Sequence, residues 1–306
     1  DALRLAWQRV APGGVLSISF MVFRQRFIAE RIARSIEAAT GEAPLVVASK
    51  GKDTFAFIRA RGISRADLAK RLGVSPVEDL GRDIRVSTDD WPFLYIRPGI
   101  FPSGYVAVLS VVLILAMGAS RAAFGKGFYS RRRFDVPLFL FGAAFLLIET
   151  RSITNLSLLF GSTWIVNAAV FGGVLLLANI ANAAVRKGSD HLVVPAVALL
   201  FVSLAVALLV TNSALSVLPL GIARAAGILI NVLPIGFAGV LFSALLARST
   251  DPVASLGSNL LGAVLGGILE YGSMIAGLRA MAAVAAAIYV VAVTVAGKRL
   301  RRPEPA

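Results

Sequence analysis

The chain has 306 residues, of which 57% are apolar and only 16% charged, and its mean hydropathy is +0.79. Soluble globular domains carry about 25% charged residues, so this composition excludes a purely soluble protein, and a chain this apolar is not disordered. The lack of cysteine excludes disulfides, thiolate zinc sites and a cysteine nucleophile. Basic residues exceed acidic ones by 14. In a membrane protein this excess indicates cytoplasmic loops and contact with anionic lipid headgroups, and not with nucleic acid.

Two regions of opposite composition follow each other. Residues 1–97 mix charged and apolar positions as a water-soluble fold does, whereas long apolar runs fill residues 98–306. Helical spacing predicts helices over 2–10, 24–40 and 68–72, and β-branched or apolar runs predict strands at 15–20, 45–49 and 55–59. This order is typical of the back half of an open α/β sheet that ends in an antiparallel hairpin. The first residue is Asp1 and not Met, and the amphipathic run at 2–10 is not a signal peptide, so we expect a fragment that starts in mid-domain.

Residues 98–306 contain seven candidate transmembrane helices. Each has close to the ~20 apolar residues that cross a ~30 Å hydrocarbon layer, and helices are expected because lipid cannot satisfy free backbone groups. We place the seven spans near residues 103–120, 136–160, 163–185, 191–210, 222–247, 255–276 and 279–297.

Several stretches resemble a known family. Leu3–Phe20 (LRLAWQRVAPGGVLSISF) is similar to the part of class I S-adenosylmethionine-dependent methyltransferases that runs through Pro-Gly-Gly into a central strand, and spermidine synthases share that fold. The runs STDDWPFLYIRPG, GAAFLLIETRSITNLSLLFGSTWIVN and GSNLLGAVLGGILEY resemble multi-pass bacterial membrane proteins fused to a spermidine-synthase-like domain. The resemblance implies the C-terminal half of an α/β Rossmann-like domain, followed by a polytopic helical bundle in the bacterial inner membrane.

The same resemblance implies aminopropyl or methyl transfer in the full-length protein. The cofactor would be S-adenosylmethionine or its decarboxylated form, and the substrate a lipid or a polyamine-like cation. The glycine-rich turn and the acidic positions of that fold would precede Asp1. We therefore expect this chain alone to bind no cofactor. Its catalytic residues are unknown. Two alternatives stay open: a transporter or channel-like bundle with a regulatory or vestigial soluble domain, and a non-catalytic membrane scaffold.

The second span carries charged residues at mid-membrane depth. Ionised Glu149 and Arg151 would each cost roughly 2.5–3.5 kcal/mol there. Residues two positions apart differ by about 200° around a helix, so each needs a partner on another helix, unless the helix breaks near Glu149 in a re-entrant turn. Asn155 shares a face with Arg151. These residues predict a substrate or proton site, or a structural ion pair that fixes helix order.

Two later spans offer partners for these charges. Ser258, Gly262 and Gly266 form a small-residue ridge that favours close helix packing, and Glu270 continues the row, with Arg151 or Arg224 as available cations. In the fifth span Arg224 and Asn231 share a face before Pro234. An ordinary proline kink, with Arg224 reaching the interface, is the alternative for that span.

The boundary between the regions is rich in aromatic and acidic residues. Trp91, with the nearby Phe93 and Tyr95, predicts an aromatic belt at the headgroup layer. Asp89 and Asp90 could cap a helix, bind a cation or close over a polar substrate. No metal site is expected, because the only histidine has no cysteine or carboxylate cluster beside it.

The basic residues predict an orientation. With seven crossings, one side holds Arg121, Lys126, Arg131, Arg132, Arg133, Arg186, Lys187, Arg248, Lys298, Arg299, Arg301 and Arg302. The positive-inside rule places this side in the cytoplasm and residues 1–97 outside, whereas use of S-adenosylmethionine would require residues 1–97 in the cytoplasm. The sidedness of residues 1–97 therefore stays open.

Overall fold

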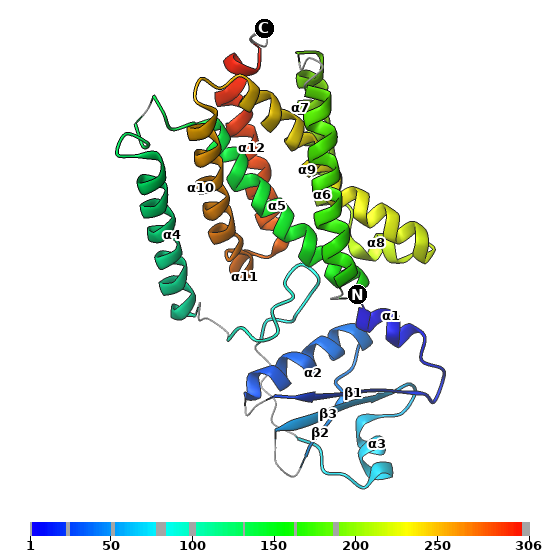
Figure 1. Cartoon of the computed structure of the whole chain (residues 1–306). Helices are drawn as coiled ribbons and strands as arrows, with labels where there is room; N and C mark the ends of the chain where they lie inside the picture. Colours follow the sequence, from blue (N-terminus) through cyan, green and yellow to red (C-terminus); the bar gives the residue numbers. More distant parts are fainter. Residues whose placement is uncertain are drawn as a thin grey trace. The chain divides into compact units, whose positions relative to one another are not determined.

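A computed structural model describes residues 2–22, 25–49, 53–77, 84–97, 102–130, 132–161, 164–185 and 190–301. It divides into two compact units, Asp1–Pro102 and Ser103–Ala306. The first unit mixes helices and strands, whereas every regular element described in the second is a helix (Figure 1).

The first unit is a small sheet with flanking helices. Its elements are α1 (Ala2–Gln8), β1 (Val15–Met21), α2 (Arg26–Thr40), β2 (Leu45–Ala48), β3 (Thr54–Ala60) and α3 (Arg65–Leu72). The sheet order is β1-β3-β2 and both pairs are antiparallel, with Val15 opposite Ala60 and Leu45 opposite Ile58. The predicted strands and the β2–β3 hairpin are thus present. The three strands give no evidence of a Rossmann fold, because a Rossmann-like sheet is built from parallel neighbours and none occurs among the described residues.

Local sequence signals explain these elements. The apolar face of α2, which includes Ile28, Ile32 and Ile36, is buried in one cluster with Phe55 and Phe57 of β3. The helix ends where Gly41 takes a left-handed conformation. Helix α3 is capped at its start, where the Ser64 hydroxyl accepts a hydrogen bond from the Asp67 amide at 3.1 Å.

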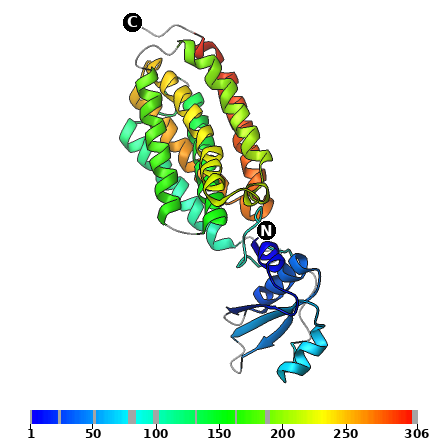
Figure 2. The same cartoon turned by 90° about the vertical axis from the view of Figure 1, so that its right-hand side faces the viewer.

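The second unit is a bundle whose long helices run side by side along one direction (Figures 1 and 2). Six helices of the described chain are long and apolar enough to cross a membrane, which is compatible with an integral, multi-pass protein. Its elements are α4 (Ser103–Phe124), α5 (Val136–Phe160), α6 (Trp164–Val185), α7 (Asp190–Leu209), α8 (Asn212–Ser216), α9 (Leu220–Ala247), α10 (Pro252–Glu270), α11 (Ser273–Ala276) and α12 (Leu278–Leu300).

Two expectations about the spans change. The seventh predicted span, 163–185, coincides with α6, but its apolar stretch with described side chains, Val170–Val185, is shorter than the other six. The re-entrant turn considered near Glu149 is wrong, because α5 continues as one helix from Val136 to Phe160. Between its two ends, a continuous helix bonds its backbone groups within itself, which lipid requires.

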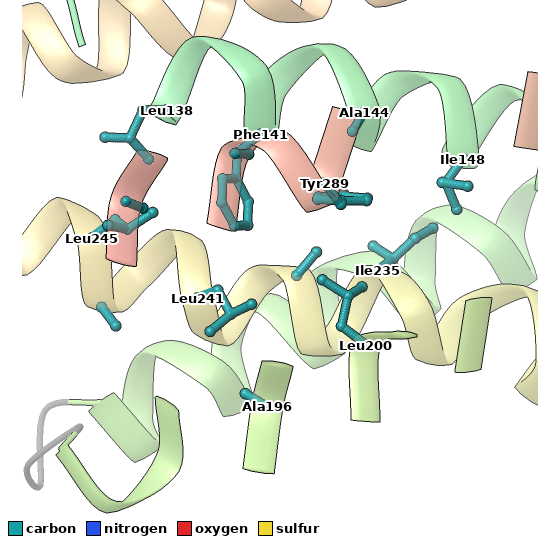
Figure 3. Packing of buried hydrophobic residues seen from close by; sticks show 14 of the residues in the cluster. Leu138, Phe141, Ala144, Ile148, Ala196, Leu200, Ile235, Leu241, Leu245 and Tyr289 are labelled. Carbon is teal, nitrogen blue, oxygen red and sulfur yellow. The ribbon is translucent and has the colours of Figure 1, made fainter. Parts of the chain in front are cut away.

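Helix α5 lies at the centre of the bundle, in contact with α10, α12 and α9. The largest apolar cluster joins α5, α7, α9 and α12, and Figure 3 shows Leu138, Phe141 and Ile148 of α5 directed toward this cluster. The predicted small-residue ridge packs against α5: a Cβ on Gly262 would collide with the carbonyl oxygen of Phe139, and one on Gly266 with that of Ala143. The backbones of α5 and α10 therefore touch.

Candidate functional site

Within the bundle, the polar residues of α5 meet neighbouring helices through hydrogen bonds. The buried Arg151 guanidinium donates to the carbonyl oxygen of Ala207 in α7 at 2.8 Å. The Ser152 hydroxyl lies 3.1 Å from the carbonyl oxygen of Asn231 in α9, and the Asn155 amide donates to the Asn231 side-chain oxygen at 3.3 Å. Three predicted site residues, Arg151, Asn155 and Asn231, thus occupy the contacts of α5 with α7 and α9.

The remaining predicted membrane residues lie apart from these contacts. Glu149 is half-buried, and so is Glu270, which accepts a hydrogen bond from the Ser273 hydroxyl at 3.4 Å. Within the described part of the chain, no ion pair joins either carboxylate to a basic side chain. The exposed Arg224 places its guanidinium 6.0 Å from the centre of the Phe160 ring. The structure therefore does not assemble the predicted intramembrane ion pair.

The boundary motif lies inside the first unit. Trp91 is buried, and the guanidinium groups of Arg31 and Arg85 lie 4.9 Å and 4.4 Å from its ring centre. Membership of a headgroup belt is therefore wrong for Trp91, because cations and neighbouring chain enclose its ring. Asp89 and Asp90 are half-buried beside it and engage in contacts of their own.

Arg31 is the buried charge that organises this segment. It is fully buried and donates to the carbonyl oxygens of Arg85, Phe93, Leu94 and Ile96 at 2.6–3.1 Å. Burial, with the nearby Arg85 charge, lowers the pKa of Arg31 from its ordinary value. Carbonyl dipoles and the Trp91 ring replace the water around the guanidinium, so Arg31 has a structural role here.

A polar cavity occurs at one end of the bundle, and we call it the basic pocket. Its volume is about 630 Å³, and it lies between the chain before α5, the α9–α10 connection and the last turns of α12. Two aspartates, Asp135 and Asp251, line it together with five basic side chains, namely Arg132, Arg133, Arg248, Lys298 and Arg299. The lining therefore carries three more positive than negative charges.

A buried network forms the inner wall of the basic pocket. The Asp135 carboxylate caps α5 by accepting from the Leu138 amide at 3.2 Å, and it also accepts from the Ser255 hydroxyl and from Arg299, both at 2.7 Å. The Ser258 hydroxyl in turn accepts from the Asp135 amide at 3.0 Å. This network fixes the start of α5 against α10 and the end of α12.

The outer wall is more exposed. Arg133 forms an ion pair with Asp251 at 3.3 Å and donates to the Phe124 carbonyl oxygen at 3.1 Å. Arg132 and Lys298 are exposed, and neither forms an ion pair or a hydrogen bond with another residue of the described ranges. A ligand can therefore reach these two cations without breaking an ion pair or hydrogen bond to a described residue.

Sequence reasoning used these basic residues only as a signal of orientation. The pocket was missed because its lining comes from three segments separated by more than 100 and by about 40 residues. The sequence did contain a signal for this pocket. Basic residues flank several predicted spans at the ends that the orientation prediction places on one side, and these ends meet at one membrane surface. Among the described residues, no group of His, Cys, Asp and Glu could hold a metal ion.

Comparison with protein-family models, with curated proteins and with solved structures finds no match to this chain. The chain combines a bundle of helices long and apolar enough to span a membrane with a positively charged pocket at one end of those helices.

Proposed function

We propose that the helical unit binds an anionic, phosphate-bearing group in the basic pocket at the membrane surface. The observation that carries this proposal is the charge of the lining, five basic side chains against two aspartates around about 630 Å³. Guanidinium groups bind phosphate oxygens through paired hydrogen bonds, and each basic side chain near a membrane surface contributes about 1 kcal/mol to attraction of anionic lipid.

A titration tests this proposal on the whole chain in a neutral detergent. Glycerol 3-phosphate supplies the phosphate monoester, and the thermal unfolding midpoint reports binding because a ligand of the folded state raises it. The double variant Arg132→Gln, Lys298→Gln removes two pocket charges that form no ion pair or hydrogen bond with any described residue. We expect it to weaken binding roughly 30-fold, the equivalent of about 2 kcal/mol.

The matched control is Arg121→Gln, Lys126→Gln, which removes one arginine and one lysine that are exposed and outside the pocket. It should leave binding unchanged, and added salt should weaken binding to the unaltered chain. Equal loss in both double variants, or no response of the unaltered chain to glycerol 3-phosphate, would contradict the proposal.

The resemblance of residues 3–20 and of the three later runs supports a second proposal. In it, the full-length protein is a spermidine-synthase-like or methyltransferase-like enzyme of a bacterial cell membrane that transfers an aminopropyl or methyl group. The charge of the basic pocket favours an anionic lipid over a polyamine-like cation as its occupant, because like charges repel. Calorimetry of a longer chain that includes the segment expected before Asp1 should show binding of S-adenosylmethionine or its decarboxylated form, and no heat with either would count against it.

A further inference from the structure

We propose that the ligand of the basic pocket is an anionic lipid, and that part of its apolar chain occupies a second cavity inside the bundle. This inference rests on the proposed anion binding and adds the chemical class of the ligand: a phosphate headgroup joined to a hydrocarbon chain.

The second cavity, which we call the apolar cavity, has a volume of about 200 Å³. Its walls are largely apolar, with Phe141, Phe145, Ile235, Phe242 and Tyr289 among them. A dry apolar cavity of about 150 Å³ holds a ring of the size of benzene, so this volume accepts several carbons of a chain. Figure 3 shows Phe141 of α5 beside Tyr289 of α12 at this place, and their ring centres are 5.4 Å apart.

The apolar cavity lies next to the basic pocket along the same helices. On α5, Pro137 lines the basic pocket and Phe141 the apolar cavity; on α10, Ser255 and Asn259 do the same. Residues four apart share a helix face and are about 6 Å apart along the axis. On both helices the residues that line the apolar cavity therefore lie one turn beyond those that line the basic pocket. A lipid with its headgroup in the basic pocket and its chain in the apolar cavity requires this order.

The wall of the apolar cavity also reaches the outer face of the bundle. Asn182 of α6 lines the cavity and is exposed, and its side-chain oxygen accepts a hydrogen bond from the Ser243 hydroxyl of α9 at 2.6 Å. A chain can thus enter from the lipid that surrounds the helices. An unfilled apolar void loses the dispersion contacts of its lining, and in a bilayer the molecules at hand to fill it are lipid chains.

The experiment compares three probes on the whole chain in neutral detergent. Dioleoyl phosphatidic acid has both the phosphate and the chains, glycerol 3-phosphate has the phosphate alone, and dioleoylglycerol has the chains alone. The variant Ala178→Phe places a ring in the apolar cavity, and Ala183→Phe is its control, since Ala183 is exposed on the same helix and does not line the cavity.

We expect Ala178→Phe to raise the half-saturating concentration of phosphatidic acid at least tenfold relative to Ala183→Phe. The binding of glycerol 3-phosphate should stay unchanged. Dioleoylglycerol should bind at least tenfold more weakly than phosphatidic acid. Unchanged glycerol 3-phosphate binding also shows that the variant is folded; if that binding is lost, the smaller Ala178→Leu replaces it and must meet the same criterion.

The outcomes separate the two proposals. If glycerol 3-phosphate binds and Ala178→Phe does not change the binding of phosphatidic acid, the cavity inference is overturned. The basic pocket then remains a site for a free phosphate compound. Failure of both phosphate probes on the unaltered chain overturns the proposed function itself. Equal binding of dioleoylglycerol and phosphatidic acid overturns the joint site.

Discussion

Arg31 illustrates how one buried charge holds a segment without regular structure. The chain at 84–97 forms no helix or strand, and four of its carbonyl groups accept hydrogen bonds from this guanidinium. A buried cation is tolerated only when such partners replace its water, and removal of one side leaves the other unsatisfied. The aromatic residues of this segment are therefore ordered by a residue about 60 positions earlier.

Replacement of that cation should loosen the segment. Arg31→Met keeps an unbranched, flexible side chain but removes its donors, and we expect a loss of about 3 kcal/mol in the local opening free energy. Amide hydrogen exchange of the whole chain measures this at residues 84–97. Arg34→Met is the control, because Arg34 is partly exposed and pairs with Glu37 three residues away. Equal protection in the two variants would show that Arg31 does not hold the segment.

The carboxylates of Glu149 and Glu270, in the helical bundle, differ from the Arg31 guanidinium in their partners. Glu149 and Glu270 form no ion pair with any described residue, so neutralising them removes a charge and no ionic attraction to a described basic side chain. Glu149→Gln and Glu270→Gln should leave the unfolding midpoint unchanged or raise it. A fall equivalent to more than about 1 kcal/mol would indicate a counter-charge. Solute uptake by proteoliposomes that both variants abolish would favour the transport alternative.

At the scale of elements, helix packing depends on a few glycines. The ridge of α10 was predictable from its four-residue spacing, but its partner was not, because nothing local to residues 258–266 distinguishes α5 from other apolar helices. The partner helix contributes its own small residue: a Cβ on Gly142 would collide with the carbonyl oxygen of Asn259. Close contact of two backbones therefore needs glycine on both helices.

A leucine on the ridge tests this contact. Gly262→Leu forces the α5 and α10 backbones apart, and we expect a loss of about 1–3 kcal/mol in the free energy of unfolding in detergent. Gly118→Leu on α4 is the control, since a Cβ there meets no atom within 4 Å. If the two variants were equally stable, the close approach of α5 and α10 would be refuted.

The contact between α5 and α9 depends on amides. Asn155 donates to Asn231, which also donates to the Gly227 carbonyl oxygen at 2.8 Å. A double-mutant cycle with Asn155→Leu and Asn231→Leu should give a coupling energy of about 0.6 kcal/mol, the usual size for such bonds within membranes. Additive effects of the two substitutions would mean that the pair contributes nothing.

For the whole molecule, the sequence was informative where the signal is local. Apolar length and periodicity predicted the long apolar helices and the strands. The basic pocket was not predictable, because its charges come from three distant segments and only the bundle brings them together. Trp91 was misassigned because local sequence does not distinguish an aromatic residue of a headgroup belt from one buried in a core. The contact with Arg31, which is distant in the sequence, places Trp91 in the core.

The central claim is that the basic pocket holds a phosphate-bearing lipid, and native mass spectrometry of the whole chain released from anionic membranes tests it most directly. The account predicts that the unaltered chain and Arg121→Gln, Lys126→Gln retain one phosphate-bearing lipid, whereas Arg132→Gln, Lys298→Gln retains it at a reduced fraction. Retention that is equal in all three chains, or a bound lipid without phosphate, would contradict the account.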